Sequence, residues 1–323
     1  MKALITGIGG QDGYYLTRLL LKEGVTVFGV ARDQERARRS LGEVSSQVTI
    51  LSGDLAQSGV WPSLLSEVKP DEIYNLAAQT SVPRSWQDPV LSARSTALSV
   101  LEALAAIRDS APKTRFFQAS SSAMYGEARE SPQTEETPFF PNTPYGTAKL
   151  FAHYAVINFR EGAGLFAVNG ILFNHESPFR SPNFVTRKIT LAAARIAAGK
   201  ERKLKLGRLD TIRDWGFAGD YVRAMRAALR ADAPTDYVIA SGETHSVREV
   251  VEIAFGRLGL NWKEYVETDS AFYRVAEADR LVGDSSRARR LLGWKPTVSF
   301  RALIEMMVDR DVERVARGED EAE

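Results

Sequence analysis

The sequence predicts an α/β protein with a doubly wound parallel sheet and a smaller C-terminal α/β part. Three observations lead to this prediction. Short apolar runs alternate with segments of helical periodicity up to about residue 175. A glycine-rich turn joins the first apolar run to the first helical segment, and beyond residue 175 the alternation loosens. Regular alternation of strand and helix is typical of a parallel sheet that helices cover on both faces.

The N-terminal part holds the regular alternation. Its first strand, Ala3–Ile5, precedes a helix at Gly13–Glu23 whose leucines recur at helical spacing. The further strands expected are short and apolar: Val25–Ala31, Val48–Leu51, Glu72–Ala77, Phe116–Ala119 and Ala167–Phe173. The further helices expected in this part are Ser92–Ile107 and Tyr145–Arg160.

The C-terminal part mixes helices with short strands. The expected helices are Phe184–Ala198, Val247–Leu258, Ser286–Leu292 and a last one after the turn at 293–296, and the expected strands are Lys203–Leu206 and Tyr237–Ala240. The chain has neither an internal repeat nor a low-complexity linker. We therefore expect two packed domains with a cleft between them, at 1–175 and 176–323, with segments near 215–245 returning to the first.

Composition excludes several classes of function. The 323 residues include 42 Lys and Arg against 41 Asp and Glu, a net charge of +1, so no overall field attracts nucleic acid or a membrane. The absence of cysteine excludes disulfides, zinc–thiolate sites and thiol nucleophiles. The first residues lack the basic start of a signal peptide, and no run of about 18 apolar residues occurs. We expect a cytoplasmic protein that acts on a small molecule.

The glycine-rich turn is the strongest local signal. Gly7, Gly10 and Gly13 have the spacing G-x-x-G-x-x-G at the first strand–helix junction, a variant of the Rossmann dinucleotide fingerprint. Glycines allow the backbone to approach a pyrophosphate at a helix N-terminus. The sequence therefore predicts a Rossmann-type sheet with an NAD(P) site that Gln11 and Asp12 also contact. An ordinary glycine turn is the alternative explanation.

The ends of the next strands bear on the choice between NADP and NAD. Arg32 follows the second strand and favours NADP, because a basic residue there accommodates a 2′-phosphate. Asp33 keeps NAD open, because an acidic residue holds the ribose diol. Further cofactor contacts are expected after the third and fourth strands, at Asp54, Leu55, Leu76, Ala77 and Ala78.

A tyrosine and a lysine open the helix expected at 145–160. Tyr145 and Lys149 are four residues apart and therefore lie on one helix face. Tyrosine ordinarily has a pKa near 10, which a neighbouring ammonium and a positive nicotinamide would lower, so that Tyr145 becomes a usable base or acid. Ser120 and Ser121 follow the fifth strand and can supply a hydroxyl to the same substrate oxygen.

The glycine turn, the serines and the Tyr–Lys pair, in this order, resemble the extended short-chain dehydrogenase/reductase superfamily. Longer segments across nearly the whole chain are similar to the GDP-mannose 4,6-dehydratase family: Gln118–Ser122, Thr137–Pro141, Pro144–Leu150, Phe166–Pro178, Asn183–Ile189, Arg213–Gly216 and Gly293–Pro296. The resemblance implies a lyase that oxidises the sugar 4-hydroxyl with NADP, eliminates the 6-hydroxyl and returns the hydride, giving GDP-4-keto-6-deoxymannose. It implies Tyr145 as the base, Lys149 as its tuner and Ser121 as the hydroxyl partner.

One position departs from the family pattern. The family has a Glu at the serine turn that removes the proton from the sugar 5-position, whereas this chain has Ala123. Loss of a general base costs about two to four orders of magnitude in rate, but oxidation at the 4-position needs no such carboxylate. Three hypotheses stay open. They are a dehydratase with its base elsewhere (Glu127 or Glu130 is near in sequence), a 4-epimerase or 4-keto reductase without dehydration, and a non-catalytic binding protein.

The resemblance also implies a GDP-sugar site in the second part, where Lys188, Arg213 and Arg274 are the expected cations. The remaining residues of this set are Asn174, Val185, Leu206, Gly207 and Glu277. Arg187 and Arg223 are expected to be solvated surface charges. No metal site is expected, because His175 has no second ligand at a useful spacing, and a structural, hydrogen-bonded role is favoured for it.

Assembly follows from the same resemblance. It implies a homodimer formed through the faces of the helices at 92–107 and 145–160. A tetramer stays open, although residues 32–47 are shorter than the arginine-rich loop through which tetramers of the family form.

Overall fold

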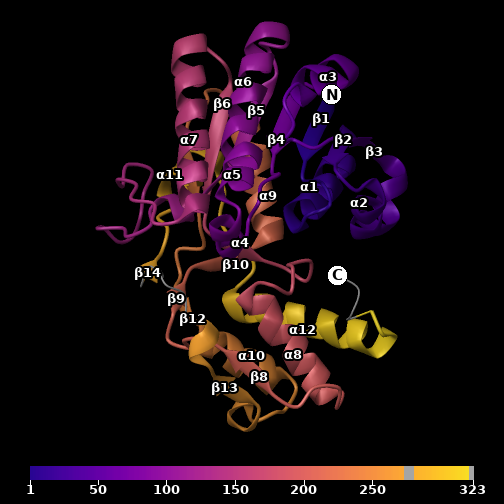
Figure 1. The fold of residues 1–323 in the computed structure, drawn as a ribbon, viewed down its shortest axis with the longest axis vertical. Coiled ribbons are helices and arrows are strands. Elements are labelled where there is room, and N and C mark those ends of the chain that lie inside the picture. The colour runs from indigo at the N-terminus through magenta and orange to yellow at the C-terminus, as the bar shows by residue number, and fades with distance from the viewer. Residues whose placement is uncertain (273–279, 320–323) are drawn as a thin grey trace.

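Seven parallel strands form the central sheet of the computed structural model, which describes residues 1–272 and 280–319. The bounds are β1 Lys2–Thr6, β2 Thr26–Ala31, β3 Thr49–Ser52, β4 Glu72–Asn75, β5 Arg115–Ser121, β6 Ala167–Leu172 and β11 Tyr237–Ile239. Their order in the sheet is β11-β6-β5-β4-β1-β2-β3, with every neighbouring pair parallel (Figure 1). The chain winds outward from β1 in both directions, which is the doubly wound arrangement that the sequence predicts.

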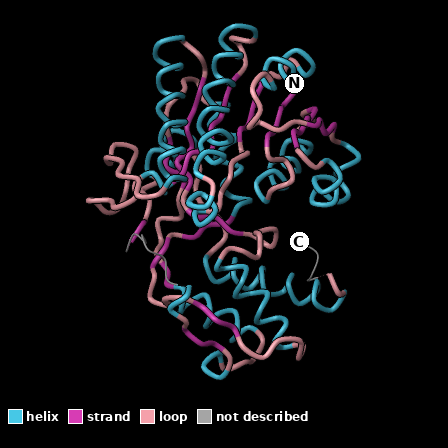
Figure 2. The backbone as a smooth tube through the Cα atoms, in the orientation of Figure 1, coloured by secondary structure: helices cyan, strands magenta, loops and turns pink. Residues whose placement is uncertain are grey.

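Helices cover both faces of the sheet, as the tube view shows (Figure 2). One face packs against α1 (Gln11–Lys22), α2 (Gln34–Leu41) and α9 (Ala218–Arg230). The other face packs against α3 (Val60–Val68), α6 (Ser99–Ser110) and α7 (Pro144–Ala163). Because both faces are covered, the central strands are buried on both sides. The predicted fold class is therefore confirmed.

A smaller unit below the sheet in Figure 1 has its own apolar core. It consists of α8 (Val185–Ala197), α10 (Val247–Arg257), α12 (Phe300–Arg317), β8 (Leu204–Leu206) and β13 (Val266–Thr268). Two small sheets lie between the units: β7 (Asn174–Glu176) with β10 (Trp215–Phe217), and β9 (Ile212–Arg213) with β12 (His245–Ser246) and β14 (Arg280–Leu281). The chain crosses between the units repeatedly, since α9, β11 and α11 (Ser286–Leu292) pack in the sheet unit.

Some elements were not predicted from the sequence. The helix α9 contains charged residues at positions that face the protein, and its Arg226 is buried against Glu72 and Glu23. The sequence analysis did not predict this helix, although its apolar residues recur at helical spacing. The helices α2 and α3 were also not predicted; both are short, and α2 is mostly polar.

One helical stretch is longer and more apolar than the others. α5 (Pro89–Ala93), a single π turn at Arg94–Leu98 and α6 form a continuous helix, Pro89–Ser110, where the sequence predicted Ser92–Ile107. Among the described residues it is the one helix with the length and composition of a membrane span, and 44% of its most apolar window is buried in the protein. Its α6 part packs against α3 and α7, which accounts for its inner apolar side.

A buried carboxylate connects the small sheets to the large one. Asp214 lies between β9 and β10 and is fully buried. Its Oδ1 accepts hydrogen bonds from the amide and hydroxyl of Ser241, and its Oδ2 accepts from the amides of Gly242 and Gly283. Charge-assisted bonds of this kind are about twice as strong as neutral ones. A single side chain thus fixes the segments that follow β11 and β14 against the β9–β10 turn.

A second buried polar cluster lies under the end of β5. Ser120 Oγ donates to Asn169 Oδ1 at 3.1 Å and lies 3.4 Å from His153 Nδ1. Asn169 also donates to Asp236, which Arg160 holds through two hydrogen bonds. Ser120 is only 3% exposed, so its hydroxyl supports the strand end from below. The expectation that it faces a substrate oxygen is wrong, because its proton already has a buried acceptor.

His153 makes the stability of the fold depend on pH. Burial lowers the pKa of His153 to about 4, while Asp236 opposes this shift and Arg160 adds to it. The ordinary histidine pKa is about 6.5, so the unfolded chain binds the proton more readily. The free energy of unfolding should therefore fall by about 3 kcal/mol as the pH falls from 6.5 to 4. The variant His153→Gln should lack this component. Urea unfolding at several pH values measures the difference, and identical pH dependence in both proteins would contradict it.

Candidate active site

The glycine turn approaches the end of β4 very closely. Gly7 has a φ of +69°, and a Cβ atom there would lie 3.0 Å from the backbone of Ala77. At Gly13 a Cβ would lie 2.2 Å from the carbonyl oxygen of Ile8. No described side chain caps the start of α1. The first N–H groups of this helix therefore face the glycine turn without a side-chain acceptor. Gly7, Gly10, Gln11, Asp12 and Gly13 thus surround one helix N-terminus, as predicted.

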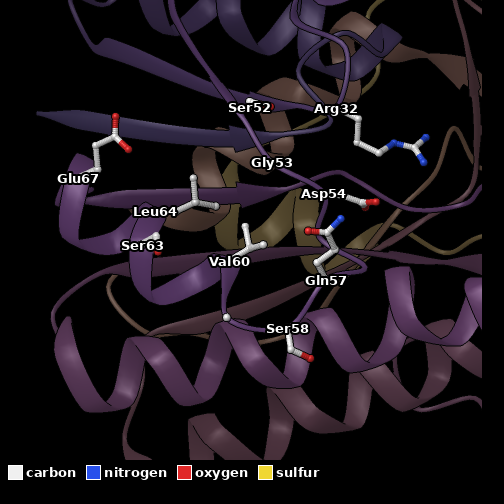
Figure 3. A pocket seen from close by; sticks show the side chains of 11 residues that line it. Arg32, Ser52, Gly53, Asp54, Gln57, Ser58, Val60, Ser63, Leu64 and Glu67 are labelled. Carbon is white, nitrogen blue, oxygen red and sulfur yellow. The ribbon is translucent and has the colours of Figure 1, made fainter.

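The ends of β2 and β3 border a cavity of about 510 Å³ (Figure 3). Arg32 and Asp54 line it from neighbouring strand ends, and their charged groups point to the same side in Figure 3. Asp33, by contrast, caps α2: its Oδ1 accepts a hydrogen bond from the Arg36 amide at 2.9 Å. The acidic side chain that would hold a ribose diol is therefore engaged elsewhere. Leu55 is buried beside the cavity in the core under α3.

Tyr145 and Lys149 lie in the first two turns of α7. Lys149 Nζ donates to the carbonyl of Ala119 at 2.7 Å and lies 5.8 Å from the centre of the Tyr145 ring. Burial lowers the pKa of Lys149 to about 8, and Asp12 opposes this shift. Burial raises the pKa of Tyr145, while a hydrogen bond with Ser121 and the charge of Arg180 oppose the rise. The sequence analysis expects a lowered pKa for Tyr145. The protein alone does not lower this pKa, so a further positive charge is needed.

The serine turn packs against the start of α7. Ser121 Oγ accepts a hydrogen bond from the amide of Ala123 at 3.2 Å, and this hydroxyl counteracts the rise in the pKa of Tyr145. A Cβ atom at Gly146 would lie 2.6 Å from the Ala123 carbonyl oxygen, so position 146 must be glycine for this contact. Residue 123 thus lies directly against the turn that carries Tyr145. Position 123 is therefore part of this site, and its side chain is a methyl group.

The acidic residues downstream of the serine turn have other roles. Glu130 Oε2 accepts a hydrogen bond from Thr137 Oγ1 within the loop that precedes α7, and Glu127 is exposed. The carboxylate whose charge acts on both Tyr145 and Lys149 is Asp12. Asp12 is itself bonded to His175, since its Oδ2 lies 2.9 Å from His175 Nε2.

Residues 175–180 hold the first turn of α1. Gln11 Nε2 donates to the His175 carbonyl at 2.7 Å, and Ser177 Oγ donates to Gln11 Oε1 at 2.9 Å. His175 Nδ1 lies 2.7 Å from the Phe173 carbonyl oxygen. Burial lowers the pKa of His175, but its contacts with Asp12 outweigh burial and raise it overall. The hydrogen-bonded role expected for His175 agrees with these contacts, whereas its place beside the cofactor turn was not predicted.

Arg187 anchors this segment from the smaller unit. Its Nε lies 2.9 Å from Asp311 Oδ2, and its Nη1 donates to the carbonyls of Pro178 and Arg180. Arg314 on α12 also donates to the Pro178 carbonyl. Arg187 is 3% exposed, so the expectation of a solvated surface charge is wrong. The sequence gives no signal of the pair, because Asp311 lies on a helix more than a hundred residues away.

Four of the expected sugar-nucleotide residues gather where α8 meets the end of β8. Lys188 Nζ donates to the Lys205 carbonyl at 2.7 Å and lies 4.1 Å from the Phe272 ring centre. A Cβ atom at Gly207 would lie 2.8 Å from the Phe272 carbonyl oxygen. Val185 begins α8, and Leu206 is buried in the core of this unit, so it offers only its backbone.

The remaining expected substrate residues lie apart from this group. Asn174 pairs with Trp215 in the β7–β10 sheet, and Arg213 pairs with His245 and Leu281 in the β9 sheet. Both therefore lie on the small sheets between the two units. Arg274 and Glu277 fall outside the described residues.

Comparisons with known proteins give the relationship of the chain. A family model described as GDP-mannose 4,6 dehydratase matches residues 4–307. The protein GDP-mannose 4,6 dehydratase 2 of Arabidopsis thaliana is 46% identical over 334 residues, which cover 98% of this chain and 88% of that protein. The relationship thus extends over both units and is not confined to the glycine turn.

Solved structures show the same fold. UDP-glucose 4-epimerase of Thermus thermophilus, in complex with NAD, superposes with a TM-score of 0.84 at 26% identity, covering 96% of this chain and 99% of that one. RMD from Pseudomonas aeruginosa, complexed with NADPH, superposes with a TM-score of 0.82 at 24% identity, covering 97% of this chain and 99% of that one. At these identities the likeness concerns the fold.

Proposed function

The chain belongs to the GDP-mannose 4,6-dehydratase family, and on this basis we propose that it oxidises the 4-hydroxyl of a GDP-linked sugar with NADP. One observation carries the proposal. Tyr145 and Lys149 lie between the cofactor turn and the serine turn; Lys149 donates to the Ala119 carbonyl, and the Ser121 hydroxyl is near enough to lower the pKa of Tyr145. A base, a cation and a hydroxyl thus converge at the carboxyl edge of the sheet, where ligands of such folds bind.

The glycine turn fits the cofactor. Side chains at Gly7 or Gly13 would collide with the backbone, so the turn leaves room for a pyrophosphate at the N-terminus of α1. When bound, the nicotinamide supplies the chemistry of accepting a hydride from the sugar and returning it. Arg32 supports NADP over NAD because it faces the cavity while Asp33 is engaged in capping α2. Asp54, Leu55, Leu76, Ala77 and Ala78 would line the remainder of the dinucleotide site.

Tyr145 would accept the proton of the sugar 4-hydroxyl, and Ser121 would bond to the same oxygen. Lys149, with its pKa lowered to about 8, keeps most of its positive charge at neutral pH. That charge and the positive nicotinamide together would lower the pKa of Tyr145, which burial alone raises. Asp12 and His175 would hold the turn in place from the other side.

The smaller unit would hold the nucleotide part of the substrate. Lys188 can bind a phosphate after releasing the Lys205 carbonyl, and Phe272 beside it offers a flat apolar surface. Val185, Leu206 and Gly207 would contribute backbone and apolar contacts at the same place. Asn174 and Arg213, on the small sheets between the units, would contact the diphosphate and sugar, and the proposal assigns Arg274 and Glu277 to the same site.

Two outcomes can follow oxidation at the 4-position. Family membership favours elimination of the 6-hydroxyl, which would give GDP-4-keto-6-deoxymannose and needs a base for the proton at the 5-position. Ala123 favours the second candidate, a 4-epimerase or 4-keto reductase without dehydration, because the residue against the Tyr145 turn cannot take a proton. Both candidates share the Tyr145 step.

Incubation with GDP-mannose and NADP in deuterium oxide separates the two candidates. A dehydratase exchanges the 5-proton with solvent, so the product should be a 6-deoxy-4-keto sugar with deuterium at the 5-position, identified by mass spectrometry and NMR. A product that keeps its 6-hydroxyl and carries no deuterium at the 5-position would refute the dehydratase candidate. Absence of any hydride transfer would instead identify a non-catalytic binding protein.

The variant Ala123→Glu should create or raise dehydration by about two to four orders of magnitude, whereas Ala123→Gln, of similar size but without a base, should not.

Arg32 should determine the preference for NADP. In Arg32→Ala the 2′-phosphate loses a charge-assisted contact, which is typically worth about 1.5–3 kcal/mol, so the affinity for NADPH relative to NADH should fall at least about tenfold. Titration of protein fluorescence with each cofactor measures the ratio. Arg39→Ala, at an exposed arginine on α2, is the matched control and should leave the ratio unchanged. An unchanged ratio in Arg32→Ala would exclude Arg32 as the 2′-phosphate ligand.

A homodimer is part of the proposal. Leu98, Leu101, Phe151 and Tyr154 form an exposed apolar face on the adjacent helices at 94–110 and α7, each at least 36% exposed. Burial of such a face drives association, so light scattering should give twice the chain mass. Phe151→Glu should yield monomers, while Val312→Glu, at an exposed apolar residue on α12, should stay dimeric. A monomeric parent protein at micromolar concentration would overturn the dimer. The cytoplasmic location expected from the sequence stays a prediction. The choice between a dimer and a tetramer stays open.

A further inference from the structure

A row of buried polar side chains runs under the carboxyl ends of β1, β4 and β5. Thr6 Oγ1 donates to Asn75 Oδ1 at 2.6 Å, and Asn75 Nδ2 donates to Gln118 Oε1 at 2.8 Å. Gln118 Nε2 then donates to the Ala119 carbonyl at 3.1 Å. None of these three side chains is more than 2% exposed. The row begins next to the glycine turn and ends on the carbonyl that holds Lys149.

Backbone groups fix the direction of this row. Thr6 Oγ1 accepts hydrogen bonds from the amides of Leu76 and Ala77, each at 3.1 Å. A hydroxyl has two acceptor positions and one proton, so the Thr6 proton must go to Asn75. The Asn75 amide therefore presents its oxygen to Thr6 and its NH₂ group to Gln118. The Gln118 amide is turned in the same sense, with its NH₂ group toward Ala119. The oxygen and nitrogen of an Asn or Gln side-chain amide can usually be assigned either way. Here the backbone amides of Leu76 and Ala77 determine the assignment.

Two donors meet at the Ala119 carbonyl oxygen. Lys149 Nζ is 2.7 Å from it and Gln118 Nε2 is 3.1 Å from it, so the two nitrogens are at most about 6 Å apart. The NH₂ group of Gln118 is the positive end of the amide dipole, and its proximity disfavours a charged ammonium. Burial acts in the same direction and lowers the pKa of Lys149 to about 8. The titratable groups that act on or lie near Lys149 are Asp12 on α1 and Tyr145 on α7.

We propose that Thr6, Asn75 and Gln118 are positioning residues that fix Lys149 relative to the cofactor turn and set the pH at which Lys149 loses its proton. They act through Ala119 and Lys149 and do not contact the substrate. The inference rests on the proposed function, in which the Lys149 ammonium supports Tyr145. It goes beyond that function by assigning a purpose to polar groups buried in the sheet unit.

The test replaces Gln118 by two residues of similar size. Gln118→Glu places a negative group within about 6 Å of Lys149, which should raise the pKa of Lys149 by about one unit or more. Gln118→Met removes the donor and should move the pKa in the same direction by less. The rate of hydride transfer from GDP-mannose to NADP is measured by stopped flow against pH. The rate should fall at alkaline pH, where Lys149 loses its proton. The pH of this fall should be higher in both variants than in the parent, and highest in Gln118→Glu.

Gln133→Met is the matched control. Gln133 is also a fully buried glutamine with two hydrogen bonds, to the Glu130 carbonyl and the Val282 amide. It should lose similar stability but keep the parent pH profile, so a purely structural effect is separated from a change at Lys149. An unshifted alkaline limb in both Gln118 variants would overturn the inference.

The pH dependence of NADPH binding, followed by fluorescence without any sugar, gives an independent measure of the protonation of Lys149. A parent protein that transfers no hydride would refute the proposed function, whereas the binding profile would still decide whether Gln118 acts on Lys149. Binding profiles of the Gln118 variants that coincide with the parent would likewise overturn the inference.

Discussion

The contact between the glycine turn and the end of β4 is the constraint on which the rest of the site depends. Gly7 lies so close to Ala77 that no side chain fits between them, and Thr6 binds the amides of Leu76 and Ala77. This contact holds the end of β1 against the end of β4, and β2 pairs with β1 on its other side. The cofactor turn, the cavity at Arg32 and the row that leads to Lys149 all begin at these strand ends. A side chain at position 7 would therefore disturb binding and catalysis together.

The sequence predicted the parts of this site that are local in the chain. The glycine spacing and the Tyr145–Lys149 pair depend on a turn and on one helix, and both lie where the pattern places them. The contacts that hold the site together join distant segments, and no local pattern reports them. The sequence predicts a surface charge at Arg187, whereas Asp311 pairs with it in the core. It predicts a substrate-facing hydroxyl at Ser120 from the residue type alone, whereas strand alternation turns Ser120 away from Ser121 and into the protein.

The segment at 175–180 connects the smaller unit to the cofactor turn. It is bonded to Gln11 and Asp12 on one side, and Arg187 and Arg314 hold its backbone from α8 and α12 on the other. A buried arginine with a buried carboxylate partner is costly to separate, by about 3–5 kcal/mol. The bonds from Arg187 and Arg314 to the Pro178 and Arg180 carbonyls thus join the smaller unit to this segment, and Arg180 brings a positive charge to Tyr145 that originates outside the sheet unit.

The charges around Tyr145 support the proposal that oxidation at the 4-position does not need a carboxylate at position 123. The groups that act on Tyr145 are Ser121, Arg180 and Asp12, together with burial, and residue 123 is not among them. Proton transfer from a 4-hydroxyl depends on these groups and on Lys149. Removal of a proton from the neighbouring carbon is a separate step with its own base. A glutamate at position 123 would add a negative charge beside Tyr145, which would raise its pKa further. In the proposed mechanism, alanine at this position would spare the oxidation step an unfavourable charge, while an elimination step would need its base elsewhere.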